Sequence, residues 1–561
     1  MAVRVRNRQD TAFVLALCAV FGALLYALTW DLRPYPFLGW VDDYRYVKSA
    51  WYLRQFEWLG PFDATTLIKR PFFPFILAVT SSLGLPFDPF QVFLYMFGVA
   101  FFVHSLLRLG IRRWIAGALF AVLAIIPTIY DSDGSRVFRE TITVGLEFVI
   151  LGLALRLLLI APQSKLRDLL WGPKSVLVYS IFALAAFHWG MREEGILLSL
   201  VLVPLLCAVG MWRLKGEVFQ RALGSLILCA GIFVFIGAAN LAIRSANYFA
   251  YGVFLVNDLS DGEFPRVVGV LKSIEEGPPS ELLLHPFETD KLVRSSPRFR
   301  QIGEVLQKVQ LNHPETDYSH EMFFLRVTAL QGTELGASAL NTQRYFRELY
   351  EELSNLCNDG TLKCEANPRL SVVPRYSRLQ WKLAAQSVAR LGEWTVRTRN
   401  SGFDFLSQRF IGVEPVPNEV LKQFVEITRQ QPFGWDGHNT EYTLPGSLPA
   451  VLHQQQRRQS MGDFYSKWSP FLYLAAALAL PVFVLLVWRA RQYEWFIVFG
   501  VLTAHASARI LAFSYLSAID EGVPVRLIKP AYPFALASAV IVLGIVVTLL
   551  SQRRPSPSSR S

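Results

Sequence analysis

The sequence predicts a polytopic α-helical membrane protein with about ten transmembrane helices and a large mixed or mostly α-helical extracytoplasmic domain inserted before the last three. Its 561 residues are 52% hydrophobic and only 18% charged, and the mean hydropathy is +0.32. Apolar stretches of roughly 20 residues, long enough to cross a bilayer, recur along the chain. This composition excludes a disordered or fibrous chain.

The expected spans are apolar runs bounded by charged residues, proline or glycine. They cover residues 11–29, 89–109, 114–130, 140–161, 175–190, 195–212, 221–243, 467–488, 494–517 and 530–550. The first run could be a signal peptide. It is long for one, and no convincing small-x-small cleavage site precedes Trp30, so we expect an uncleaved helix.

The basic residues orient these spans because cytoplasmic loops carry an excess of Lys and Arg. With the N-terminus inside, every cytoplasmic segment of this assignment is basic. We therefore expect both termini in the cytoplasm, and residues 244–466 on the other side of a bacterial inner membrane.

The expected domains follow from the spans. They are a transmembrane module (1–243, with a first outer loop at 30–88), an extracytoplasmic domain (244–466), the last three transmembrane helices (467–551) and a cytoplasmic tail (552–561). The formal net charge is +11, yet residues 244–466 contain 24 basic and 26 acidic residues, so the excess belongs entirely to the membrane portion. The charge therefore reflects membrane orientation and outer-loop chemistry, and we expect no nucleic-acid partner.

The extracytoplasmic domain shows amphipathic helical patterns and one cysteine pair. Asn341 could cap a helix that places Tyr345, Leu349, Leu353 and Leu356 on one face, and residues 378–398 have a similar pattern. Cys357 and Cys364 predict a disulfide that closes a turn, because the compartment is oxidising. A zinc site is the poorer interpretation because no second Cys or His pair accompanies them.

Acidic and basic residues gather in the outer loops, against the usual bias toward cytoplasmic basic residues. They are Asp42, Asp43, Arg45, Lys48, Lys69, Arg70, Asp131, Asp133, Arg136, Arg139, Glu140, Arg192, Glu193, Glu194, Asp520, Glu521, Arg526 and Lys529. Carboxylates can act as a general base or bind a divalent cation, and Arg and Lys can neutralise phosphate. The set indicates a site for an anionic, lipid-linked substrate. Loop salt bridges and headgroup contacts are the simpler account of any single residue.

Ionisable residues also lie within the expected spans, where they are functional candidates by default. Glu147, Asn240, His505 and Arg509 lie toward the outer side. A buried ion pair between Glu147 and Arg509 would explain two of them. His104 and Arg156 receive no role beyond helix contacts or snorkelling.

The N-terminal arrangement resembles the GT-C superfamily of polyprenyl-phosphate-dependent glycosyltransferases, such as protein mannosyltransferases and the aminoarabinose transferase of lipid A. One helix is followed by an outer loop that opens with acidic residues at 41–46 and ends with Lys69-Arg70-Pro71 before the second span. The resemblance is strongest over residues 1–200. It extends weakly to residues 525–533, which look like the "RY-x-x-P" start of a late helix in that family.

The resemblance implies residue roles. Asp43 or Asp42 would be the catalytic carboxylate, with Asp43 slightly favoured. Asp131 and Asp133, an Asp-x-Asp, could help to bind a divalent metal such as Mg²⁺ or Mn²⁺. The donor phosphate would be bound by basic residues of the outer loops, namely Lys69, Arg70, Arg136, Arg139, Arg192, Arg526 and Lys529.

The implied reaction moves a sugar from a polyprenyl-phosphate donor to an extracytoplasmic acceptor hydroxyl on a glycan, lipid or protein, in one inverting step. The chain departs from the family in placing its large outer domain before the last three spans, and no WWDYG-like motif is present, which disfavours asparagine-linked transfer. A transporter or flippase of lipid-linked sugars or envelope precursors is one alternative. It predicts inverted repeats and broken helices, which we do not find in the sequence. A non-catalytic membrane-anchored envelope protein is the other, and it leaves the charged loops unexplained.

Overall fold

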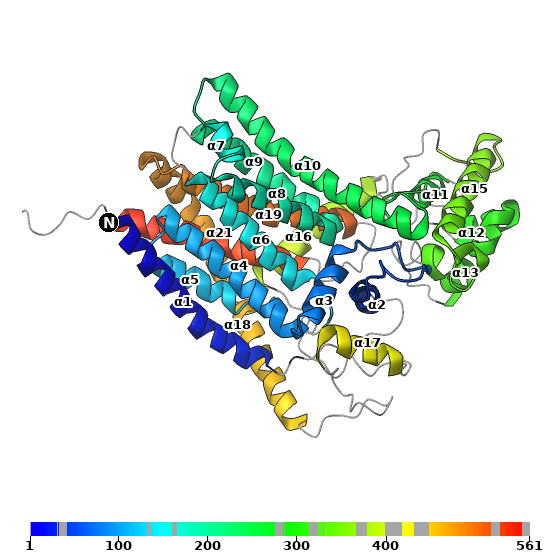
Figure 1. The fold of residues 1–561 in the computed structure, drawn as a ribbon, viewed down its shortest axis with the longest axis horizontal. Helices are drawn as coiled ribbons and strands as arrows, with labels where there is room; N and C mark the ends of the chain where they lie inside the picture. The colour runs from blue at the N-terminus through cyan, green and yellow to red at the C-terminus, as the bar shows by residue number, and fades with distance from the viewer. Residues whose placement is uncertain are drawn as a thin grey trace, which may run out of the picture.

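The computed structural model shows a bundle of long helices joined to a smaller helical unit at one end (Figure 1). It describes residues 2–30, 32, 42–131, 136–159, 165–274, 284, 286–312, 324–328, 330–365, 378–398, 418–430, 448–517 and 528–552. These residues contain no β-strand, apart from one isolated bridge between Ile274 and Cys364.

Each apolar stretch expected to span the membrane coincides with a helix of the bundle. The bundle helices are α1 (Ala2–Thr29), α4 (Phe87–Leu109), α5 (Arg113–Ala124), α6 (Glu140–Leu158), α8 (Ser175–Met191), α9 (Ile196–Arg213), α10 (Val218–Tyr251), α18 (Leu448–Arg489), α19 (Glu494–Ser517) and α21 (Tyr532–Ser551). Among the described residues, 8 helices are long and apolar enough to cross a membrane. The expected spans at 114–130 and 175–190 fall on shorter apolar helices. The chain is thus an α-helical membrane protein by helix length and composition.

Shorter elements connect the bundle and build the outer part. They are α2 (Asp42–Arg54), α3 (Phe72–Ser82), η1 (Pro127–Ile129), α7 (Leu166–Leu170), η3 (Glu193–Gly195), α11 (Phe264–Leu271), α12 (Pro286–Ser295), α13 (Pro297–Asn312), η4 (Phe324–Thr328), η5 (Glu334–Gly336), α15 (Ala339–Asn358), α16 (Arg378–Val396), α17 (Asn418–Thr428) and η6 (Lys529–Ala531).

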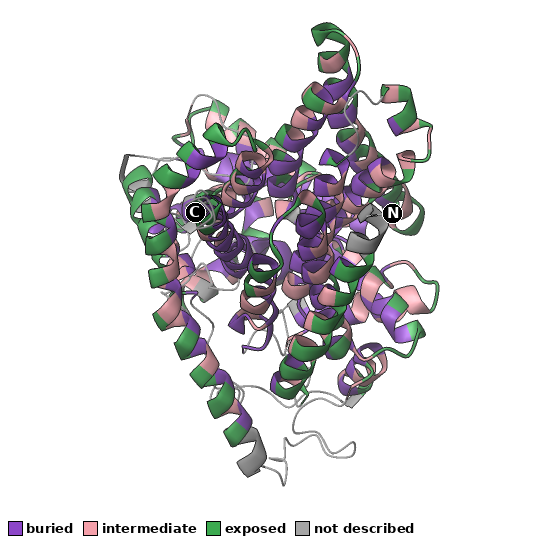
Figure 2. Cartoon of the chain, turned by 90° about the vertical axis from the view of Figure 1, so that its left-hand side faces the viewer, coloured by how far each residue is buried: buried purple, intermediate pink, exposed green. Residues whose placement is uncertain are grey.

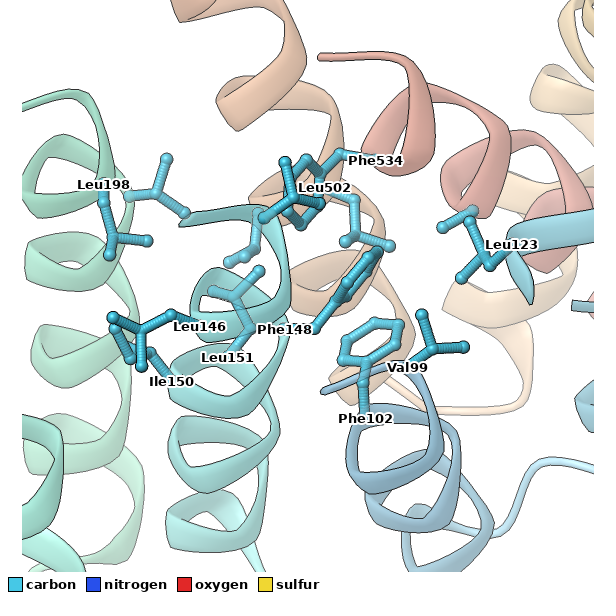
Figure 3. Packing of buried hydrophobic residues seen from close by; sticks show 14 of the residues in the cluster. Val99, Phe102, Leu123, Leu146, Phe148, Ile150, Leu151, Leu198, Leu502 and Phe534 are labelled. Carbon is cyan, nitrogen blue, oxygen red and sulfur yellow. The ribbon is translucent and has the colours of Figure 1, made fainter. Parts of the chain in front are cut away.

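Helices α4 and α6 pack backbone against backbone at the centre of the bundle. A Cβ atom added to Gly98 would lie 2.2 Å from the carbonyl oxygen of Gly145, so only glycine permits this approach. Around this crossing, Phe148 contacts Phe102 and Phe534 with ring centroids 5.2 and 4.7 Å apart (Figure 3). Buried residues concentrate along these inner helices, whereas α1 and other peripheral helices expose many apolar side chains (Figure 2). That distribution suits a bundle surrounded by lipid.

The outer unit has its own hydrophobic core, built by α11, α12, α13 and α15. Ala64 and Ile68 of the first loop are part of that core, so the loop and the unit pack together. Tyr345, Leu349 and Leu353 line the buried face of α15, as the sequence predicted. The predicted N-cap is wrong. Helix α15 begins at Ala339, so Ser338 is the N-cap residue, and its hydroxyl accepts a hydrogen bond from the backbone N–H of Asn341.

Cys357 and Cys364 are joined by a disulfide bond near the end of α15, with their Cα atoms 5.4 Å apart. This agrees with the predicted pairing.

Within residues 244–466, not all helices belong to the outer unit. Helix α10 continues to Tyr251, and α18 starts at Leu448, so both bundle helices extend into this segment. Helix α16 packs against α19 inside the bundle, and α17 packs against α2 and α3. The segment therefore contacts the membrane portion at several places along its length.

A buried ion pair fixes the outer unit to the first loop. Arg326 is completely buried, pairs with Asp258 and donates from Nη1 to the carbonyl oxygen of Ala64 at 3.0 Å. Asp258 also accepts a hydrogen bond from Gln343 at 2.7 Å, and its backbone N–H donates to Leu67. The two charges thereby compensate each other, and groups from the loop and the unit add hydrogen bonds to both; Nε of Arg326 has no partner among the described residues.

We predict that Arg326→Ala loosens this attachment, because it leaves the Asp258 carboxylate buried without its counter-ion. Such a loss costs about 3–5 kcal/mol. Limited proteolysis of the purified protein should cut residues 264–365 much faster in this variant. Arg347→Ala, which removes a mostly exposed guanidinium paired with Glu263, is the matched control and should behave as wild type. Equal proteolysis of Arg326→Ala and wild type would contradict the role given to this pair.

Candidate functional site

Charged side chains from four loops meet at the end of the bundle that carries α2 and α3, which we call the loop end. Contacts between these loops connect one group of residues, which we call the loop-end cluster. Its members are Asp43, Asp131, Arg136, Arg139, Glu140, Arg192, Glu194 and Lys529.

Asp43 lies in the first turn of α2 and is completely buried. Its carboxylate accepts two hydrogen bonds from Arg136, one from Nε at 3.0 Å and one from Nη2 at 2.6 Å. The Arg136 guanidinium also stacks on the ring of Phe138, at 3.8 Å from the centroid, and keeps 17% of its side chain exposed. This bidentate pair joins the first loop to the second and fixes the orientation of the carboxylate.

Asp131 is also completely buried and forms an ion pair with Lys529, which is 4% exposed. Lys529, Phe138 and Glu140 line a cavity of about 30 Å³, room for roughly one or two water molecules. The metal site expected at Asp131 and Asp133 is not built by the described residues. The Asp131 carboxylate is paired with the Lys529 ammonium, and Asp133 lies outside the described residues. Among the residues that the structure describes, no group of three His, Cys, Asp or Glu side chains could hold a metal ion.

Arg192 connects the third loop to the second. It is completely buried, and its Nε lies 3.1 Å from Glu194 while its Nη2 lies 3.8 Å from Glu140. Burial raises the pKa of Glu194, but the guanidinium groups of Arg192 and Arg139 outweigh it and hold that pKa well below its usual range. The Nη1 donor of Arg192 has no hydrogen-bond partner among the described residues. It is a buried donor available for an anion.

Arg139 and Arg70 bind the end of α8 through its last carbonyl groups. Arg139 donates from Nη1 to the carbonyl oxygen of Met191 at 2.7 Å, and Arg70 donates to that of Trp189 at 2.8 Å. The Arg70 guanidinium also lies 5.0 Å from the ring centroid of Trp189. Cations are favourable at a helix C-terminus, so both arginines contribute to holding α8 in place.

The remaining predicted site residues are less closely placed. Lys69 is half-buried and precedes Arg70 in the first loop. Asp42 is the first residue of α2, but its side chain lies outside the part of the chain that the structure describes, as does all of Arg526.

Neighbouring ion pairs position α2, and with it Asp43. Lys48 pairs with Asp63, and Arg54 at the end of α2 pairs with Glu426 of α17. Burial raises the pKa of Asp63, but the Lys48 ammonium and hydrogen bonds from Thr65 hold it below its ordinary value. Helix α2 is thus held at its middle by a residue of its own loop and at its end by a residue 372 positions away in sequence.

A second polar group lies deeper in the bundle, around Glu147 of α6. This carboxylate is completely buried and contacts His188 Nε2 at 3.0 Å, His505 Nε2 at 3.3 Å and Arg509 Nη2 at 3.3 Å. The pair of Glu147 and Arg509 that the sequence suggested is present, and His505 shares the helix face of Arg509. His188 was missed as a partner, since nothing in its local sequence indicates a contact with α6. Asn240 of α10 has no described contact with this group.

Comparison with known proteins finds no matching family model, no similar curated protein and no similar solved structure. The site's chemistry is therefore inferred from its geometry and from the sequence resemblance alone.

We predict that Glu147→Gln destabilises the bundle, because it removes the buried negative charge that His188, His505 and Arg509 all contact. Removing one partner of a buried pair costs about 3–5 kcal/mol. Thermal unfolding in detergent should show a lower Tm for Glu147→Gln, and a smaller loss for the double variant Glu147→Leu with Arg509→Leu. Glu217→Gln, at an exposed glutamate that precedes α10, is the control and should leave Tm unchanged. An unchanged Tm for Glu147→Gln would show that the carboxylate does not stabilise the bundle.

Proposed function

We propose that the protein is an integral-membrane glycosyltransferase of the GT-C type, which moves a sugar from a polyprenyl-phosphate donor to an extracytoplasmic acceptor hydroxyl. The supporting observation is the buried carboxylate of Asp43, held by Arg136 among basic side chains from three other loops at one end of a membrane bundle. In this proposal both termini are cytoplasmic, and the loop end faces the outer side of a bacterial inner membrane. The contacts are compatible with a general base beside a phosphate-binding region.

The paired charges suggest how a donor would be bound. A lipid-linked phosphate is a strong hydrogen-bond acceptor, and it would compete with the Asp43 carboxylate for the guanidinium of Arg136. The buried Nη1 of Arg192 offers a further donor to the same anion. Donor binding would then release the carboxylate of Asp43 at the place where the acceptor arrives.

The proposed reaction is a single displacement. Asp43 takes the proton of the acceptor hydroxyl, and the hydroxyl oxygen forms a bond to the anomeric carbon. The bond from that carbon to the phosphate oxygen breaks, and its electron pair leaves with polyprenyl phosphate. Arg136 and Arg192 stabilise the negative charge of the leaving group. A divalent metal such as Mg²⁺ or Mn²⁺, which the sequence resemblance implies, would add to this stabilisation if the donor brings one.

We predict that Asp43→Asn abolishes transfer while the protein still folds. Loss of a general base lowers the rate by roughly 10²–10⁴-fold. Membranes containing each variant would be supplied with radiolabelled polyprenyl-phosphate sugars extracted from the host. The label should leave the solvent-extractable lipid fraction with wild type and stay there with Asp43→Asn.

Asp463→Asn, at an exposed aspartate of α18, is the matched control and should transfer normally. Asp42→Asn tests the neighbouring carboxylate in the same assay. Normal transfer by both Asp43→Asn and Asp42→Asn would contradict the assignment of the base to this loop.

A further inference from the structure

A long cavity lies between α1 and α4 on the side of the bundle; no residue of the loop-end cluster lines it, although its far end reaches Asp88 and Gln430 near the loop end. Its volume is about 710 Å³, and most of its lining is apolar, including Leu15 and Leu25 of α1 and Phe93 and Phe97 of α4. Helix α1 lies along one edge of the bundle beside α4 and α5 (Figure 1). Leu15 and Phe93 are 63% and 66% exposed, so the cavity is a groove open to the surroundings of the bundle.

The groove has the length of a bilayer core. Its lining runs from Thr11 to Thr29 along α1, which is roughly 27 Å at 1.5 Å per residue. The hydrocarbon region of a typical bilayer is about 30 Å thick. A groove of this length and lining, open to the bilayer, accepts a hydrocarbon chain.

The end of the groove nearest the N-terminus is polar and basic. Arg156 of α6 lines it and stacks on Phe101, with 4.0 Å between the guanidinium carbon and the ring centroid. Its Nε donates to Ser105 at 3.1 Å, and its Nη2 donates to His104 Nδ1 at 2.8 Å. Since Nδ1 of His104 accepts that bond, the His104 proton is on Nε2, which lies 3.4 Å from the hydroxyl of Thr11.

Arg156 therefore has only neutral partners among the described residues, and no described carboxylate lies within ion-pair distance of it. Two further charged residues lie near this end: Arg108, one helical turn beyond His104, and Asp10, which is paired with Arg113. An arginine in a lipid-facing groove without an acidic partner is costly unless an anion reaches it. The groove thus combines a hydrocarbon channel with an uncompensated cation at one mouth.

We propose that this groove binds an anionic glycerophospholipid, with the phosphate at Arg156 and one acyl chain along α1 and α4. The lipid comes from the leaflet on the side of the N-terminus, which is opposite to the loop end. The site is thus separate from the proposed donor site. It would hold even if the proposed glycosyl transfer were wrong.

Native mass spectrometry of the full-length protein in detergent tests this site. The probes are phosphatidylglycerol and phosphatidylcholine with identical acyl chains. One arginine near an anionic lipid changes affinity by about fivefold, so wild type should prefer phosphatidylglycerol by at least that factor. Arg156→Gln should lose the preference. Arg213→Gln, at an arginine of α9 that is paired with Glu494, is the matched control and should keep it.

A second variant separates lipid binding from folding. Gly22 lines the groove, and a Cβ atom there would meet nothing within 4 Å, so a Phe side chain can start from this position and extend into the groove. Gly22→Phe should weaken the binding of both lipids with an unchanged Tm. The proposal is overturned if wild type shows no preference, if Arg156→Gln keeps it, or if Gly22→Phe binds both lipids as wild type does. Stronger binding of a polyprenyl phosphate than of phosphatidylglycerol would likewise overturn the assigned occupant.

Discussion

A charge buried inside a membrane bundle needs a partner, and the arrangement of this protein depends on how that constraint is met. Glu147 of α6 contacts His188, His505 and Arg509, which come from α8 and α19. These helices are distant in sequence, and apolar packing alone does not fix their rotation or register, because lipid chains are as apolar as leucine. The polar contacts do fix them, and so determine where the loops that follow α8 and α19 emerge.

In the loop-end cluster, too, buried charged side chains are paired with side chains of opposite charge. The paired residues come from different loops, so each pair also joins two loops: Asp43 with Arg136, and Asp131 with Lys529. Outside the cluster, the pair of Arg54 and Glu426 attaches α2 to α17, which belongs to the segment that was expected to form a separate domain. The cluster is therefore supported by the rest of the outer portion. Its internally paired state suits a resting site that opens when an anionic substrate competes for the arginines.

Much of the fold, but little of the site geometry, could be predicted from the sequence. The spans were predictable because apolar length and basic flanks are local properties, and the disulfide because Cys357 and Cys364 are near neighbours. The number of spans between the charged loops predicted that these loops lie on one side of the membrane, but it did not predict which residues would pair with one another. Arg139 and Arg70 bind carbonyls of α8, His188 reaches Glu147 across the bundle, and Arg156, to which the sequence assigned no role, lies in a groove. Such contacts depend on helix rotation, which hydropathy does not encode.

The central claim is that the loop-end cluster transfers a sugar from a lipid phosphate to an envelope acceptor. The most direct measurement is mass spectrometry of envelope glycans and of lipid-linked sugars in a strain lacking this protein and in its parent. We expect one sugar to be missing from the envelope of the deletion strain, and its polyprenyl-phosphate form to accumulate in the membrane. Identical glycans and identical lipid-linked sugars in the two strains would contradict the account.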